Sequence, residues 1–97
     1  MVSRILAKID FFPTDEGGRG SPLPKGRVGY VLETGGQNFS CWILNTGAEA
    51  IEPGDTAQVE VVLAAPELAL PLLKKGSSFV LKDYREIARG VVESVQT

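Results

Sequence analysis

Short segments of alternating apolar and polar residues, separated by turn signals, constrain the fold of this chain more than any other feature. Residues 4–12 form the clearest segment. The apolar positions on one of its faces are Ile5, Ala7, Ile9 and Phe11. A period of two is the signature of a strand with one buried face. We therefore predict a half-buried β-strand here, which Pro13 ends.

Five more segments have strand-like patterns. They are residues 27–33, 39–44, 56–64, 78–82 and 86–95. Residues 66–70 are expected to form a short helical turn that starts at Pro66 and is limited by Pro71. Six short strands at near-regular spacing favour a small antiparallel barrel or sandwich, and closure would remove exposed strand edges. Since 97 residues are too few for two domains, we predict a single all-β domain over residues 1–97.

Glycine and proline indicate where the chain turns. Pro53-Gly54-Asp55 is expected to form a type II turn, because proline fixes φ and glycine supplies a positive φ. Gly90 lies in the middle of the last predicted strand, where glycine often marks a β-bulge or a barrel corner.

The composition excludes several classes of function. One cysteine and no histidine allow no internal disulfide, no structural zinc site and no Ser-His-Asp triad within the chain. Cys41 has apolar neighbours and is expected to be a buried structural thiol. No pair of carboxylates is placed by the sequence for acid–base work, so we expect no enzyme, no cofactor and no metal. With no signal peptide and no membrane-spanning apolar run, a cytoplasmic protein without a membrane partner is expected.

The loop over residues 14–26 is rich in glycine and contains Asp15-Glu16-Gly17-Gly18-Arg19. Two interpretations of it remain open. Backbone N–H groups at Gly17 and Gly18 with the Arg19 guanidinium could bind a phosphate. Alternatively, the glycines only provide the positive φ of a tight structural turn. The motif is not a P-loop, because the Gly-Lys-Ser/Thr ending is absent.

The order of these signals resembles the C-terminal β-barrel domain of elongation factor Tu over nearly the whole chain. The loop is similar to that family's Asp-Glu-Gly-Gly-Arg-His-Thr-Pro segment, with Gly20 in place of the histidine and Ser21-Pro22 in place of Thr-Pro. Pro53-Gly54-Asp55 and Gly90-Val91-Val92 also match family motifs, whereas residues 35–45 diverge. The resemblance implies a six-stranded antiparallel β-barrel, here as a stand-alone domain without the GTPase domain.

In that family the domain packs against a GTPase domain and contacts the backbone of tRNA. The second property implies RNA-phosphate contacts in this chain at Arg19, Ser21, Lys25, Lys82 and Arg85. Other basic residues, such as Arg27 and Arg89, lie among acidic ones, so a mixed solvated surface is favoured over a cationic patch.

Three functions remain open. The first is a protein-interaction module, with self-association as a special case. Its candidate interface residues are Trp42, Leu44, Leu68 and Leu70. The second is an RNA- or tRNA-binding module, and the third is a small-ligand carrier or an enzyme of unrecognised type. The net charge of −2 favours the first function over the second, because RNA-binding proteins are more often basic.

Trp42 is the residue that best separates these functions. It alternates with Phe39, Cys41 and Ile43, so either Trp42 or this trio should face outward. An outward Trp42 would form an interaction patch. A base-stacking platform made of Trp42, Phe39 and Tyr30 is a less favoured alternative, because most aromatic residues in strands belong to the core.

Overall fold

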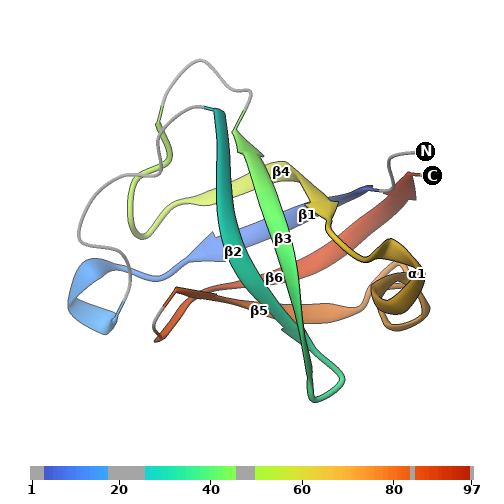
Figure 1. Ribbon diagram of the computed structural model, residues 1–97. Coiled ribbons are helices and arrows are strands. Elements are labelled where there is room, and N and C mark those ends of the chain that lie inside the picture. The colour runs from blue at the N-terminus through green and yellow to red at the C-terminus, as the bar shows by residue number, and fades with distance from the viewer. Residues whose placement is uncertain (1–3, 18–25, 46–49, 84, 97) are drawn as a thin grey trace.

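The protein forms a closed, six-stranded antiparallel β-barrel (Figure 1). The computed structural model describes residues 4–17, 26–45, 50–83 and 85–96. The strands are β1 (Arg4–Phe11), β2 (Gly26–Thr34), β3 (Gln37–Asn45), β4 (Thr56–Leu63), β5 (Ser78–Asp83) and β6 (Arg85–Gln96). Their order around the barrel is β1-β4-β3-β2-β5-β6, and β6 pairs with β1 to complete the closure. The predicted all-β barrel is therefore confirmed.

Alternate residues of the strands fill the barrel. The predicted inner face of β1 is correct, since Ile5, Ala7 and Ile9 are fully buried and Phe11 is nearly so. Strand β3 contributes Phe39, Cys41 and Ile43. Strand β4 contributes Val59, Val61 and Leu63. The opposite residues of each strand lie on the outer surface, where any partner must bind.

The predicted turn at Pro53-Gly54-Asp55 is present. Gly54 has a φ of 92°, and the Asp55 N–H donates to the carbonyl oxygen of Glu52 at 3.0 Å. The Gly54 N–H also donates to the Phe11 carbonyl oxygen at 3.0 Å, which joins this turn to the end of β1. Gly17 ends the short 3-10 helix η1 (Thr14–Glu16) with a φ of 93°, while Gly18 lies outside the described residues.

Of the two roles predicted for Gly90, a β-bulge or a barrel corner, the bulge does not lie at this residue. The β6 register shifts on either side of it, at Ile87 against β5 and at Glu93 against β1. Gly90 itself pairs regularly with Ile9 and with Phe79. A Cβ at Gly90 would overlap the Phe79 ring, so the position accommodates an aromatic side chain inside the barrel.

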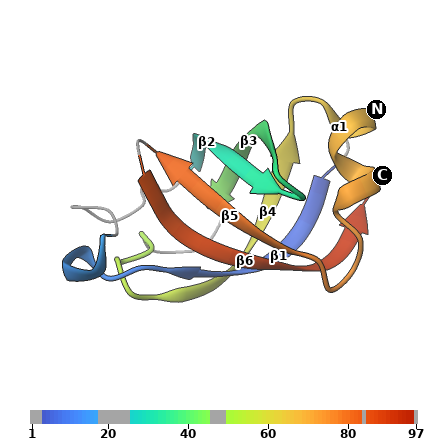
Figure 2. The ribbon, with the colours of Figure 1, turned by 90° about the horizontal axis from the view of Figure 1, so that it is seen from below.

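A short helical segment lies at one end of the barrel, beside the start of β1 and the end of β6 (Figures 1 and 2). It consists of α1 (Pro66–Ala69) and the 3-10 helix η2 (Leu70–Leu72). The helical turn is as predicted, since α1 ends at Ala69, before Pro71. Helical geometry then continues through Pro71 as the 3-10 helix η2, which accommodates proline at an early position. Ala69 in this segment and Leu73, which directly follows it, are fully buried and close the core at that end.

Candidate functional site

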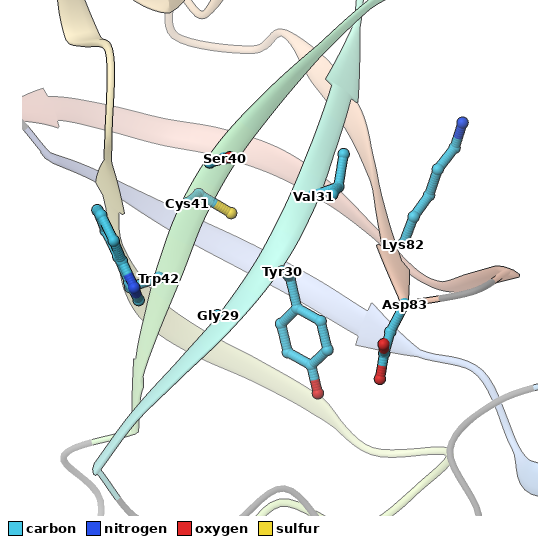
Figure 3. Close-up of a pocket in the computed structure, with 8 residues that line it drawn as sticks. All are labelled: Gly29, Tyr30, Val31, Ser40, Cys41, Trp42, Lys82 and Asp83. Atoms are coloured by element: carbon cyan, nitrogen blue, oxygen red, sulfur yellow. The ribbon is translucent and has the colours of Figure 1, made fainter.

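A surface hollow of about 570 Å³ lies over β2, β3 and the end of β5. We call it the β2–β3 hollow. It is lined by Gly29, Tyr30, Val31, Ser40, Cys41, Trp42, Lys82 and Asp83. Trp42 lies on one side of the two strands, and Lys82 and Asp83 lie on the other side (Figure 3). The hollow thus has an aromatic wall and a charged wall.

The pairing register explains why the surface is hollowed here. Gly29 is opposite Trp42, and Val31 is opposite Ser40. One member of each pair is small, so the floor is low between two larger side chains. A Cβ at Gly29 would lie 3.7 Å from Cδ1 of Trp42, so the indole lies against this glycine.

Trp42 occupies the outer face of β3. Phe39, Cys41 and Ile43 point into the core. Trp42 points the opposite way and is half-buried. This resolves the two orientations that the alternation left open. The three-residue stacking platform is wrong, because Tyr30 and Phe39 are buried.

The Arg27 side chain packs over the ring of Trp42. Its guanidinium carbon lies 4.2 Å from the centroid of the Trp42 ring, which is a close cation–π contact. Arg27 is exposed, and no carboxylate within the described ranges forms an ion pair with it. The sequence placed Arg27 only among scattered basic residues, and nothing in it indicated this contact.

Of the five phosphate-contact candidates, Lys82 and Arg85 lie among the described residues. Arg19, Ser21 and Lys25 lie outside the described residues. Lys82 lines the hollow, and its Nζ lies 3.1 Å from Oε1 of Glu33 with both side chains about one-third exposed. Arg85 is exposed and lies opposite Asp83 in the β5–β6 pairing. Lys82 and Arg85 therefore share one hairpin, but Lys82 already has an acidic partner.

The four interface candidates fall into two places. Trp42 and Leu44 both lie half-buried on the outer face of β3. Leu68 lies on α1 with 64% of its surface exposed, and Leu70 packs partly against the core. Only Trp42 lines the β2–β3 hollow. The hollow also contains Gly29 and Ser40, which residue-type reasoning missed because small residues in strands carry no signal of their own.

Cys41 contributes backbone to the hollow but not a reactive thiol. Burial raises its pKa to about 12, and a hydrogen bond with the backbone of Tyr30 offsets this only in part. The thiol is therefore protonated at neutral pH and is a poor nucleophile. This agrees with the expected structural role.

Within the described ranges, no three acidic, cysteine or histidine side chains gather in a way that would bind a metal ion. In the same part of the chain, no helix has the length and apolarity required to cross a bilayer. No protein-family model matches the chain, and no curated protein matches its sequence.

Proposed function

We propose that this protein is a non-catalytic β-barrel of the elongation factor Tu C-terminal type that binds another protein through the β2–β3 hollow. The observation that carries the proposal is the position of Trp42, half-buried on the outer face beside a hollow with a floor of Gly29 and Ser40. Tryptophan is enriched among residues that dominate binding energy, particularly where it borders a pocket that a partner can fill.

The site is prepared for binding before a partner arrives. Its floor consists of two strands paired along nine residues each, from Gly26↔Asn45 to Thr34↔Gln37. Gly29 and the Arg27 guanidinium both lie against the indole of Trp42, so contacts with β2 should limit the rotamers that its side chain can adopt. A preorganised side chain loses less conformational entropy on binding, so more of the contact energy appears as affinity.

RNA binding has less support. Lys82 is paired with Glu33, and Asp83 adds a second carboxylate to the same wall. One face of Trp42 is covered by Arg27, which leaves less of the ring for stacking on a base. We keep tRNA binding as a competing outcome of the test.

The test uses Gly29→Gln, which should fill the hollow without removing a core side chain. Immobilised wild-type protein and the variant are exposed to a lysate of the source organism. Proteins retained only by the wild type are identified, purified and titrated, with the emission of Trp42, the chain's one tryptophan, as the readout. Ser78→Gln, an exposed change near the start of β5, is the matched control.

We expect a purified partner to bind the wild type and Ser78→Gln equally and Gly29→Gln at least about tenfold more weakly. Equal binding to all three proteins would contradict a role for the hollow. Salt-sensitive binding of tRNA that Gly29→Gln leaves unchanged, with no protein retained selectively, would favour the RNA function instead.

A further inference from the structure

We infer that the β2–β3 hollow recognises a peptide segment of its partner in which an apolar side chain enters the hollow and a neighbouring carboxylate binds Arg27. This inference rests on the proposed function and adds the chemistry of the partner. The observation that supports it is the distribution of charge around the hollow, because the cation on one wall has no acidic partner among the described residues and the cation on the other wall has one.

Arg27 supplies the anion-binding end. Its guanidinium lies over the Trp42 ring, and the described residues provide it with no carboxylate. By contrast, Arg4 binds Glu60 at 2.6 Å and Lys82 binds Glu33 at 3.1 Å. A guanidinium that contacts an aromatic face keeps N–H donors at its edge, where they can bind a carboxylate with two parallel hydrogen bonds.

The opposite wall offers an acidic side chain no excess of positive charge. Lys82 is paired with Glu33 there, and the exposed Asp83 lies opposite Arg85. A carboxylate at that wall meets acidic and basic groups in equal number, whereas one beside Arg27 is attracted to a guanidinium with no acidic partner among the described residues. The charges therefore favour the orientation in which the carboxylate of an acidic segment lies beside Arg27.

The middle of the site accepts an apolar side chain. Trp42 and the 38%-exposed Val31 flank the glycine and serine of the floor. A volume of about 570 Å³ falls within the range of ordinary ligand pockets and suits a large apolar side chain with its adjoining backbone. Arg27 and Gly29 are two positions apart on one face of β2, so the carboxylate should lie within two residues of the apolar side chain.

The experiment is a selection of random peptides displayed on phage against the wild type, Arg27→Gln and Gly29→Gln in parallel. Arg27→Gln removes the charge and keeps a polar side chain of moderate length. We expect the wild type to enrich peptides that place Asp or Glu within two residues of a large apolar residue. Neither variant should enrich this pattern.

The strongest peptide is then synthesised with its acidic residue intact or changed to the amide. Each form is titrated against the wild type and against Arg27→Gln, with the emission of Trp42 as the readout. We expect the amide peptide to bind the wild type about tenfold more weakly, and Arg27→Gln to bind both peptides with the same reduced affinity. Such non-additivity would show that the carboxylate acts through Arg27.

Two other outcomes separate the inference from the proposed function. Peptides that lose binding with Gly29→Gln but are indifferent to Arg27→Gln would overturn the carboxylate inference and leave the hollow as a protein-binding site. If Gly29→Gln enriches the same peptides as the wild type, and no purified protein partner binds this variant more weakly, both the carboxylate inference and the proposed function are overturned.

Discussion

Two pairs of a glycine and an aromatic residue lie on opposite faces of the barrel wall, and the glycine has a different role in each. Inside, Gly90 lies beneath Phe79, and a Cβ at that position would overlap the ring. Outside, Gly29 lies beside Trp42, but a Cβ there would be in ordinary contact at 3.7 Å. Packing requires the inner glycine. The outer glycine is not required sterically, and its main effect is to leave the hollow open.

The largest expected effect is the loss of the inner aromatic ring. Phe79 is 2% exposed and lies within the core, so Phe79→Ala should lower the free energy of unfolding by about 3–5 kcal/mol. Trp42→Ala, on the outer face, should cost only about 1 kcal/mol. Urea unfolding followed by circular dichroism measures both, because that signal survives the loss of the tryptophan. Equal losses would remove the distinction between the two aromatic residues.

Next in size is a methyl group added beneath the inner ring. Gly90 does not have a positive φ, so alanine can adopt its backbone conformation, and the cost of Gly90→Ala comes from displacing Phe79. We expect a loss of about 1–3 kcal/mol in urea unfolding. In a Phe79→Leu background the same change should cost less, because the smaller side chain leaves room. If Gly90→Ala lowers the free energy of unfolding equally in both backgrounds, the added methyl group does not clash with the Phe79 ring.

These pairs also show what the sequence could predict. Alternation along residues 4–12 was enough to identify the buried face of β1, and the spacing of strands and turns was enough to predict a barrel. The role of Gly90 was not predictable, because it depends on Phe79 in the neighbouring strand and on register shifts at Ile87 and Glu93. Local patterns identify faces, whereas contacts between strands depend on register.

The candidate site was predictable only in part, for the same reason. The alternation around Trp42 limited it to two orientations, and the burial of its neighbours in the barrel decided between them. The hollow needs Gly29, Ser40 and Lys82 to meet from three strands, and no spacing in the sequence shows this. The contact between Arg27 and Trp42 likewise joins two strands through the β2–β3 register.

A smaller effect of opposite sign is expected at the outer glycine. Gly29→Ala should raise the free energy of unfolding by about 0.5–1 kcal/mol, because glycine in a strand loses more conformational entropy on folding and the added Cβ meets no clash. Urea unfolding beside the wild type gives the value. A loss as large as that of Gly90→Ala would mean that both glycines are retained for packing, and the outer one would no longer point to function.

The smallest change in the free energy of unfolding is expected for Arg27→Gln. This variant tests whether the outer pair, Gly29 and Trp42, contributes to binding and not to folding. An exposed cation–π contact contributes about 0.5–1 kcal/mol, and glutamine can keep part of the packing against the ring, so Arg27→Gln should lower the free energy of unfolding by about 0.5 kcal/mol or less. It should nevertheless make Trp42 more accessible to quenching by acrylamide, because the guanidinium no longer covers the ring. Lys8→Gln, on the outer face of β1, is the control and should alter neither measurement. Unchanged quenching would mean that Arg27 does not hold the indole in solution. If quenching increases while the free energy of unfolding falls by no more than this, the contact between Arg27 and Trp42 contributes little to folding, and its effect on partner binding can be measured in a protein that is otherwise intact.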